Sequence, residues 1–488
     1  MSGARAPAAG QGAGAQPAGR ALMSLPQAVS GARGVLLFPV AKAPAISSVA
    51  IDSRAVTPGA LFVALTGERT DGHAYLTQAL ENGAAALLIR EDKARVMGDA
   101  LRAQAAAKGA AVIVAADTLT ALQDLARSHM RRIPGVTRIG VTGSNGKTTT
   151  KEIIGGILSI GSHAAVNEGN LNSEIGLPVA CFSVEPAHRY AVFEMGMNRR
   201  GEMDILVDIV RPDLALITNI GTAHIGILGN KQHIAEEKKK IFALFSGTQT
   251  GFLPEEEPFS AFLAEGVKGR VVFFGPKSTR GYRGSESLGL DGTLINWEGF
   301  RIRFPLFGPH NVMNALAGIT VGLELGVPLA EIKDGLEADT PLFGRSQVIK
   351  GPVTVAFDCY NANPDSMAQA LSFLEQVPWK GRKVAVLGGM RELGAESAEA
   401  HRALGRRLSS AAVDEVILFG AEMADAWAQL SAERRARGFW TEDYEELASV
   451  VGRLVREGDL LLIKGSRGLE LERLLSLVSP GKQEASCS

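Results

Sequence analysis

The residues of this chain with the clearest chemical potential lie in the segment VTRIGVTGSNGKTTT, which spans positions 136–150. β-Branched residues at its start predict a strand, which a glycine-rich turn and a helix-like pattern follow. Such a turn binds nucleotide phosphates because its backbone N–H groups and the helix N-terminus face the anion. Lys147 adds a positive charge, and the Thr148 hydroxyl can ligate Mg²⁺. The common P-loop has a glycine five residues before Gly146, where this chain has Val141, so the segment predicts a shorter GxxGKT loop.

Two polar residues downstream favour a phosphate site over a chance match of a short glycine-rich loop. Glu194 comes near the end of the strand expected at 190–195, and His224 comes just after the strand expected at 214–220. In open α/β sheets, ligands bind beyond the carboxyl ends of parallel strands. We therefore expect Glu194 to ligate Mg²⁺ and His224 to lie beside it. The alternatives are a solvated loop acid and a structural, hydrogen-bonding histidine.

Lys238 lies on the apolar face of the helix predicted for KQHIAEEKKKIFALF, residues 231–245. It follows Ile234 by four residues and precedes Ile241 by three, so the three side chains share one helical stripe. Burial lowers the pKa of a lysine and leaves a neutral amine. Such an amine can add CO₂ to form a carbamate, which is an anionic ligand for a second Mg²⁺. The alternative is that the Lys238 ammonium extends along the apolar surface to solvent.

The elements that must position these residues are short apolar runs alternating with helical patterns, which predict an α/β protein with parallel sheets. A chain of 488 residues exceeds one ordinary core, so we expect two or three domains. Its 46% hydrophobic and 21% charged residues are typical of a soluble globular protein. The net charge of −1 does not indicate binding to nucleic acid, and no apolar run approaches the roughly 20 residues of a membrane span. The three cysteines lack paired spacing, which is typical of a reducing cytoplasm and argues against a metal cluster.

The chain divides into four expected segments. Residues 1–44 form a low-complexity N-terminal extension that we expect to be disordered, with Met23 as an alternative start. Residues 45–116 alternate short strands with one helix and predict a small α/β domain. Residues 117–307 contain the phosphate loop and predict a central P-loop ATPase domain with a parallel sheet. Residues 308–488 repeat strand–helix units and predict a Rossmann-like domain.

Several motifs follow one another along the chain. The N-terminal and central motifs are TGSNGKTTT, GNLNSEIGLP, FEMGMNRRGEM, ITNIGTAHIGILGN and the lysine helix. The C-terminal motifs are GPHNVMNALA, GRS, DCYNANPDSM, LGGMRELG and LIKGSRGLELE. In this order the motifs resemble one enzyme family, the Mur ligases, which form amide bonds with ATP during peptidoglycan synthesis. YNANPDSM is similar to the branch that adds D-alanyl-D-alanine, whereas the DNPR pattern of the branch that adds diaminopimelate or lysine is absent. The resemblance covers roughly residues 45–475.

The resemblance implies an ADP-forming ligase that attaches D-alanyl-D-alanine to UDP-N-acetylmuramoyl-tripeptide through an acyl phosphate. The pentapeptide product belongs to cell-wall biogenesis, and with it to cell shape and cell division. ATP and two Mg²⁺ ions are the implied cofactors, and we expect a cytoplasmic monomer. Residues 45–116 would bind the UDP-sugar, and residues after about 308 would bind the acceptor and rotate as a rigid body when ATP binds.

Three other functions remain as alternatives. One is a different Mur ligase or a ligase of the folylpolyglutamate synthetase type, and another is a nucleotide-binding scaffold that no longer ligates. The third is a P-loop kinase acting on a small metabolite. Such a kinase would leave YNANP and the 45–116 domain without a purpose, and a scaffold would not need a two-metal site.

The resemblance also implies roles for individual residues on the ATP side. Lys147, His224, Lys238 and Arg345 would act in catalysis, with Arg345 reaching the γ-phosphate from the last domain. Thr148 and Glu194 would hold the first Mg²⁺, and His224 and carbamylated Lys238 would hold the second. The residues that would contact ATP are Gly143, Ser144, Asn145, Gly146, Lys147, Thr148, Thr149, Asn314, Arg345 and Asp358.

Substrate contacts are implied in three regions of the chain. The segments around IDSR and DGH would bind the UDP-sugar through Ser53, Arg54, Asp71 and His73. Asn170 and Asn172 would contact substrate from the central domain. The candidates on the dipeptide side are Asn361, Asn363, Ser366 and Lys464.

The chain departs from the family pattern at four positions. Gly389 stands where the family has an aspartate, so that acid cannot act here. Met195 and Met197 replace a leucine and an alanine, which we expect to change packing only. Lys240 occupies a position where an acid is common, and its charge is expected to weaken the second metal site slightly.

Overall fold

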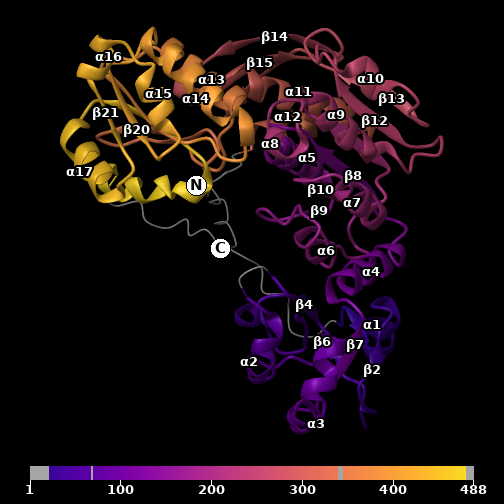
Figure 1. Ribbon diagram of the computed structural model, residues 1–488. Helices are drawn as coiled ribbons and strands as arrows, with labels where there is room; N and C mark the ends of the chain where they lie inside the picture. Colours follow the sequence, from indigo (N-terminus) through magenta and orange to yellow (C-terminus); the bar gives the residue numbers. More distant parts are fainter. Residues whose placement is uncertain (1–20, 68–69, 339–343, 480–488) are drawn as a thin grey trace, which may run out of the picture. The chain divides into compact units, whose positions relative to one another are not determined.

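The computed structural model describes residues 21–67, 70–338 and 344–479, and the chain forms two compact units, Met1–Arg132 and Ile133–Ser488 (Figure 1). The first unit contains a five-stranded sheet in the order β2-β7-β6-β5-β4, of which β4 to β7 run parallel. Its strands are β2 (Val35–Leu36), β4 (Ser48–Ala50), β5 (Ala60–Val63), β6 (Ala86–Arg90) and β7 (Ala111–Ala115), with a separate pair β1 (Met23–Ser24) and β3 (Ala45–Ile46). Its helices are α1 (Leu25–Gly31), α2 (Leu76–Glu81), α3 (Glu91–Ala107) and α4 (Thr118–Arg131).

The expectation that residues 1–44 are disordered is wrong for residues 21–44, while residues 1–20 lie outside the described ranges. Ser24 caps α1 through two hydrogen bonds. Its side chain accepts from the backbone N–H of Gln27, and the Gln27 side chain accepts from the backbone N–H of Ser24. Strand β2 pairs antiparallel with β7. Local capping and one edge pairing therefore give this segment structure despite its simple composition.

Helix α4 belongs to the first unit, so the boundary expected at 116/117 is displaced to Arg132. The Thr118 hydroxyl donates to the carbonyl of Ala64 at 2.8 Å, which fastens the start of α4 to the first sheet. Gly31 of α1 lies against α4, where an added Cβ would be 2.8 Å from Leu125 Cδ1 and would displace that side chain. These contacts separate α4 from the phosphate-loop strand that follows it.

The second unit contains a six-stranded, fully parallel sheet in the order β13-β12-β11-β8-β10-β9. Its strands are β8 (Thr137–Thr142), β9 (Ala164–Val166), β10 (Tyr190–Glu194), β11 (Leu214–Ile217), β12 (Thr250–Pro254) and β13 (Arg270–Phe274). The helices that follow these strands include α5 (Lys147–Gly161), α6 (Gly176–Cys181), α7 (Glu202–Val210), α8 (Ile225–Leu228), α9 (Lys231–Lys239) and α10 (Ser260–Ala264). An antiparallel sheet follows, formed by β14 (Tyr282–Ser287), β15 (Thr293–Trp297) and β16 (Phe300–Phe304).

Two helices after position 308 pack with the central sheet and α5. From the sequence, both are instead expected in the last domain. Ala317 and Val321 of α11 (Pro309–Glu324) share one buried cluster with the β8 residue Ile139. Helix α12 (Leu329–Glu337) packs on α5 in turn. The boundary expected at 307/308 therefore lies too early, because α11 and α12 pack with the central sheet and α5.

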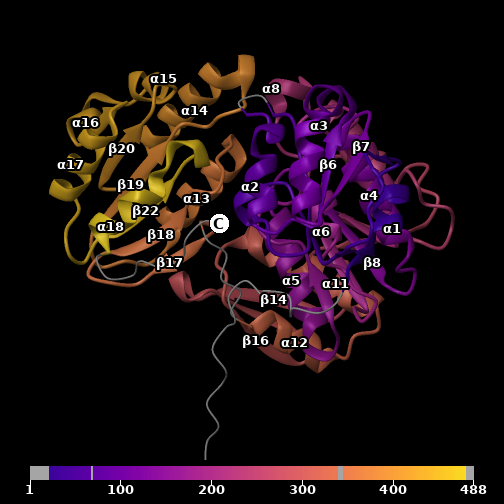
Figure 2. The ribbon, with the colours of Figure 1, turned by 90° about the horizontal axis from the view of Figure 1, so that it is seen from below.

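The C-terminal sheet has the order β17-β18-β22-β19-β20-β21, with β17 antiparallel to the rest. Its strands are β17 (Gln347–Ile349), β18 (Thr354–Asp358), β19 (Lys383–Gly388), β20 (Glu415–Phe419), β21 (Gly438–Thr441) and β22 (Leu460–Lys464). One face packs on α13 (Pro364–Gln376) and α14 (Ser397–Ser409), and the other on α17 (Tyr444–Leu454) and α18 (Leu475–Val478), as Figure 2 shows. The predicted α/β class and the Rossmann-like last domain are confirmed.

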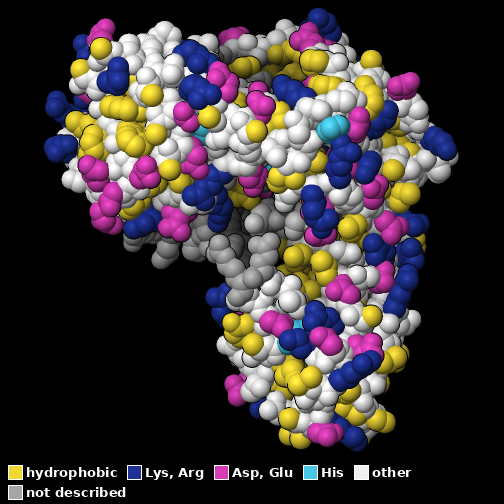
Figure 3. All heavy atoms as spheres, viewed as in Figure 1, with side chains coloured by type: hydrophobic (Ala, Val, Ile, Leu, Met, Phe, Trp, Pro, Cys, Tyr) yellow, Lys and Arg dark blue, Asp and Glu magenta, His cyan; other side chains and the backbone are white. Residues whose placement is uncertain are grey.

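The surface carries charges of both signs. Lys and Arg side chains alternate with Asp and Glu side chains across the face of the molecule in Figure 3, without a large field of one sign. Within the described ranges, no helix combines the length and the apolar character needed to cross a membrane.

We predict that Gly335→Ala lowers the stability of the second unit by about 1–3 kcal/mol, because α12 and α5 pack backbone to backbone at this point. A methyl group at Gly335 would overlap the backbone of Ile157. The matched control is Gly452→Ala in α17, where no atom lies within 4 Å of the added methyl group. This helical site should gain about 0.5–1 kcal/mol. Urea unfolding followed by circular dichroism measures both, and equal shifts would contradict the packing argument.

Candidate active site

The phosphate loop joins the end of β8 to the start of α5 and needs glycine at both of its glycine positions. Gly143 has φ +147° and Gly146 has φ +79°, where residues with side chains are strained. A Cβ at Gly143 would overlap the Thr218 hydroxyl, and one at Gly146 would lie 2.5 Å from the Asn314 side-chain oxygen. The predicted strand, loop and helix are confirmed, and Thr218 just after β11 and Asn314 of α11 lie against the loop glycines.

Thr148 and Glu194 form the acidic part of the site. The Thr148 hydroxyl donates to Glu194 Oε2 at 2.5 Å, and Asn172 Nδ2 donates to Glu194 Oε1 at 2.7 Å. Both Thr148 and Glu194 are buried. The two residues come together because β10 is paired with β8, so that the end of β10 lies beside the loop. The solvated-acid alternative for Glu194 is wrong.

Lys147 and Lys238 form the basic part of the site and converge on one carbonyl. Nζ of each lysine donates to the oxygen of Gly143 at 2.9 Å. The Lys238 side chain is fully buried, so the predicted helical face is confirmed and the alternative of an ammonium in solvent is wrong. Burial and the charge of Lys147 lower the pKa of Lys238 well below that of a free lysine, and burial lowers the pKa of Lys147 as well.

His224 lies at the phosphate-loop cavity, whereas Lys240 pairs with two carboxylates. His224 lines the cavity at a backbone φ of +64°, and its Nδ1 lies 2.9 Å from Glu392 Oε2. Burial lowers the pKa of His224. Lys240 Nζ instead pairs with Asp204 at 2.7 Å and with Glu237 at 2.8 Å. These two carboxylates balance the charge that the sequence suggested would disturb the site.

A cavity of about 220 Å³ runs from the phosphate loop to the last domain. It is lined by most of the residues predicted to bind ATP or substrate in the second unit, namely Ser144, Asn145, Gly146, Lys147, Thr149, Asn172, Glu194, His224, Asn314, Arg345, Asp358, Asn361, Asn363, Ser366 and Lys464. Gly143, Thr148, Asn170 and Lys238 are not among the residues that line it. Thr148 and Lys238 are covered by the groups they contact, and Asn170 is exposed elsewhere.

Several predicted contact residues already have partners within the fold. Asn314 accepts from the Thr150 hydroxyl at 3.1 Å and donates to Asn311. Lys464 is buried and pairs with Asp358 at 2.6 Å. The Arg345 guanidinium lies 3.9 Å from the centre of a tyrosine ring, that of Tyr360. These internal contacts hold the lining side chains in place.

Two aromatic residues of the cavity were not predicted from the sequence. The rings of Phe307 and Phe373 stack with centroids 3.9 Å apart and an interplanar angle of 16°. Both line the cavity beside His310. Phe307 follows β16 and Phe373 belongs to α13, so nothing in local periodicity connects them.

The departures from the family pattern are explained by neighbouring side chains. A Cβ at Gly389 would lie 2.8 Å from Glu422 Oε2, so a carboxylate from another segment occupies the space beside this glycine. Met195 and Met197 are both buried, in agreement with the expected role in packing.

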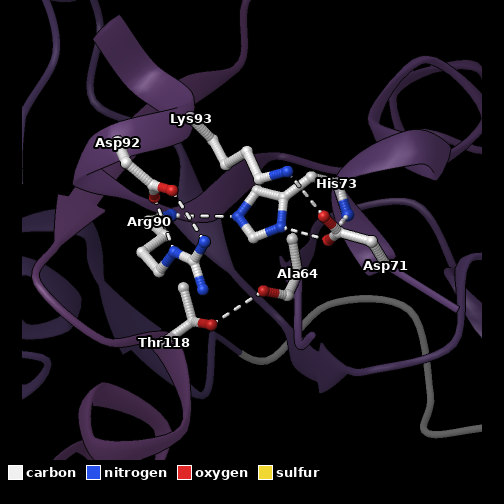
Figure 4. Close-up of polar contacts among 7 residues, drawn as sticks. All are labelled: Ala64, Asp71, His73, Arg90, Asp92, Lys93 and Thr118. Carbon is white, nitrogen blue, oxygen red and sulfur yellow. Dashed lines mark hydrogen bonds and ion pairs between the residues drawn. The ribbon is translucent and has the colours of Figure 1, made fainter. Parts of the chain in front are cut away.

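The four predicted UDP-sugar residues lie in the first unit, and two of them are engaged in its interior. The Ser53 hydroxyl donates to Gln78 at 2.6 Å, and His73 is only 3% exposed. Figure 4 shows His73 between Asp71 and the backbone of Arg90. Its Nδ1 lies 2.6 Å from Asp71 Oδ1, and its Nε2 accepts from the Arg90 N–H at 3.0 Å. His73 therefore positions the loop, while Arg54 is exposed.

Asp71 is the centre of this small network. Its second oxygen pairs with Lys93 Nζ at 2.7 Å. Burial alone would raise the pKa of Asp71, but the Lys93 ammonium and His73 together hold it well below its usual range. The carboxylate thus joins the loop after β5 to the helix after β6 (Figure 4).

A metal ion bound in the second unit would need ligands in addition to protein side chains. Across the described ranges, no three or more His, Cys, Asp or Glu side chains form a cluster that could hold a metal ion. The Thr148 hydroxyl and the Glu194 carboxylate are oxygen donors in direct contact. Mg²⁺ suits such a pair, because it binds one or two carboxylates and takes its other ligands from phosphates and water.

The fold and this site define a family. The chain matches the family models for the Mur ligase catalytic domain over 45–130, the Mur ligase middle domain over 141–322 and the Mur ligase glutamate ligase domain over 344–467. It is 42% identical to UDP-N-acetylmuramoyl-tripeptide–D-alanyl-D-alanine ligase of Treponema pallidum, over 94% of this chain and 99% of that protein. The chain belongs to the Mur ligase family.

Solved structures agree with this assignment. A crystal structure of MurF from Acinetobacter baumannii is 31% identical, with a TM-score of 0.81, and the match covers 92% of this chain and 97% of that one. The structure of MurF ligase from Thermotoga maritima in complex with ADP is 27% identical, with a TM-score of 0.72, and covers 88% of this chain and 96% of that one.

We predict that His73→Ala destabilises the first unit by about 2–4 kcal/mol, because it leaves the buried Arg90 N–H without its acceptor. Urea unfolding measures the change. The matched control is Arg54→Ala, whose side chain is 81% exposed and pairs with Asp52 at the surface. It should leave stability nearly unchanged and raise the KM of a UDP-linked substrate. A stable His73→Ala protein with a raised KM would instead identify His73 as a substrate contact.

Proposed function

We propose that this chain catalyses the ATP-dependent attachment of D-alanyl-D-alanine to UDP-N-acetylmuramoyl-tripeptide. The observation that carries the proposal is the match, over nearly the full length of both proteins, to the relative of that name at 42% identity. The intact arrangement of Lys147, Thr148 and Glu194 supports it, since a protein that merely binds nucleotide does not need a buried carboxylate beside the phosphate loop. The proposal also places the reaction in the cytoplasm and in a monomer, as expected from the sequence.

The first step activates a carboxylate, which is by itself a poor electrophile. An oxygen of the tripeptide carboxylate attacks the γ-phosphorus of ATP, the bond from that phosphorus to the bridging oxygen breaks, and ADP leaves. The products of this step are an acyl phosphate and ADP. Phosphoryl transfer of this kind depends on positioning and on neutralising charge. In the chain, the loop amides and Lys147 bind the phosphates, and Arg345 contacts the γ-phosphate.

The second step forms the amide. The free amine of D-alanyl-D-alanine attacks the acyl carbon and loses a proton, and the resulting tetrahedral intermediate expels inorganic phosphate. Water must be excluded because an acyl phosphate hydrolyses. The cavity supports this requirement, since it lies between the central sheet and the last domain and is walled by the Phe307–Phe373 stack.

Two Mg²⁺ sites complete the proposed centre. Thr148 and Glu194 would hold one ion, and His224 and a carbamate on Lys238 would help to hold the other. The chemistry that Mg²⁺ supplies is neutralisation of the charge on the transferring phosphoryl group. The buried Lys238 amine has the lowered pKa that carbamate formation needs, and the neighbouring charge of Lys147 would stabilise the resulting anion. Asn314 and Asp358 would contact adenosine, and Arg54 would contact the UDP-sugar.

We predict phosphate release from ATP that requires both UDP-N-acetylmuramoyl-tripeptide and D-alanyl-D-alanine, with a product heavier than the tripeptide by the dipeptide less one water. Coupled phosphate detection and mass spectrometry measure the two quantities. Turnover with a single amino acid such as glutamate or diaminopimelate as acceptor would overturn the assignment of the dipeptide.

Glu194→Gln preserves the shape of the side chain and should lower kcat about 10²- to 10³-fold, because it removes a charge in contact with Thr148.

We also predict that ¹³C-bicarbonate gives a carbamate signal on the protein in ¹³C NMR, because the neutral Lys238 amine can add CO₂. Lys238→Arg should abolish both the signal and activity, since a guanidinium does not form this adduct. Lys240→Ala is the matched control, because Lys240 is two residues away on the same segment but is partly exposed and paired with Asp204 and Glu237. It should keep the signal. A signal that survives Lys238→Arg would contradict the carbamate.

A further inference from the structure

Helix α13 begins with the motif that marks the dipeptide-adding branch, and its polar residues build the helix start. The Asn363 side chain accepts from the backbone N–H of Ser366 at 2.9 Å, and the Ser366 hydroxyl accepts from the backbone N–H of Asn363 at 3.1 Å. This reciprocal arrangement is a capping box. Two of the residues expected on the dipeptide side, Asn363 and Ser366, therefore cap this helix.

The same helix start contacts the phosphate loop. Asn363 is buried, and its Nδ2 donates to the side-chain oxygen of Asn145 at 2.7 Å. The Asn145 carbonyl in turn accepts from the Thr218 hydroxyl at 2.6 Å and from Asn219 Nδ2 at 3.0 Å. Helix α13, the phosphate loop and the segment after β11 thus belong to one hydrogen-bonded network.

Asp365 makes the closest connection to the segment that carries His224. Its Oδ2 accepts from both the backbone N–H and the hydroxyl of Thr222, each at 3.0 Å. A Cβ at Gly221 would lie 2.6 Å from the same oxygen, so glycine at this position makes room for the carboxylate. Asp365 does not line the cavity, unlike its neighbours Asn363 and Ser366.

The segment is held again on the other side of His224. The backbone of Gly226 approaches that of Gly394 so closely that a side chain at Gly226 would overlap it, and the Gly226 N–H points to the Glu392 carbonyl at 3.3 Å. Between these two attachments, His224 has a φ of +64°. A residue other than glycine keeps such a conformation when the surrounding structure imposes it. The last domain supplies that constraint at Thr222 and at Gly226.

We propose that Asp365 is a positioning residue for phosphoryl transfer, acting through Thr222 on the segment that presents His224 to the ATP site. The C-terminal motif thereby acts on the ATP half of the reaction, in addition to any contact with the acceptor. This inference rests on the proposed function, because it assigns a residue to one step of that reaction. The motif would then have two roles, one in phosphoryl transfer through Asp365 and one in contact with the acceptor. The sequence alone does not separate these roles.

The test separates the two half-reactions. ADP formation is measured in a single turnover with ATP and UDP-N-acetylmuramoyl-tripeptide in the absence of D-alanyl-D-alanine, and the KM of the dipeptide is measured in the full reaction. Asp365→Ala should slow ADP formation about 10- to 100-fold through the loss of two hydrogen bonds to a charged acceptor, and leave the dipeptide KM within about twofold. Asp365→Asn keeps an oxygen acceptor and should recover most of the rate.

Thr222→Val provides an independent variant, because it removes the hydroxyl and keeps the backbone N–H. It should have a smaller effect, and its combination with Asp365→Ala should be less than additive, since both act on one contact. If Asp365→Ala fails to fold, Thr222→Val and Asp365→Asn carry the same comparison. Glu399→Ala, which removes an exposed acid from the first turn of α14, is the matched control and should leave both quantities unchanged.

Two outcomes overturn the inference. One is wild-type ADP formation by Asp365→Ala with a raised KM for the dipeptide, which would make Asp365 an acceptor contact. The other is strict additivity of the Thr222 and Asp365 changes. Failure of the proposed function is recognised separately, because the wild-type protein would then form no dipeptide-dependent product.

Discussion

Two lysine amines share one carbonyl oxygen in the second unit, and the surrounding structure accommodates the charge they bring. Lys147 and Lys238 both donate to Gly143 at 2.9 Å, and Lys238 is fully buried while Lys147 lines the cavity. Two ammonium groups this close in a medium of low dielectric repel strongly. Burial and this repulsion lower the pKa of Lys238, and the nearby Glu194 carboxylate offsets part of the charge. The lysine charges consequently favour an anion such as phosphate at this site.

The order of the parallel strands brings these groups together. β8 lies between β10 and β11, so the loop that follows β8 meets the end of β10 at Glu194 and the end of β11 at Thr218. β10 and β11 are buried along their length and β8 is buried from Ile139 onward, and polar residues gather where these strands end. The chemistry is thus confined to one edge of the sheet, where backbone amides are free to face a ligand.

The last domain contributes to this edge through residues that also build its own structure. Asn363 caps α13 and contacts Asn145, while Asp365 accepts two hydrogen bonds from Thr222. One side chain that both caps a helix and contacts another segment loses side-chain entropy once. Two side chains that each made one of these contacts would lose it twice. Hydrogen bonds therefore connect the start of α13 in the last domain to the phosphate loop and to the segment after β11.

The sequence by itself determined the features that depend on short-range periodicity. The strand, loop and helix around Lys147, the buried face of Lys238 and the placement of Glu194 at a strand end all follow from spacing within about fifteen residues. Spacing of this kind does not report which sheet a helix joins. Tertiary contacts placed α4 with the first unit through Thr118, and they placed α11 on the central sheet through Val321. They also give His73 and Asn363 internal hydrogen bonds that the sequence did not predict. A polar side chain near a strand end or a helix start can face a ligand or the fold, and that choice depends on partners that are distant in the sequence.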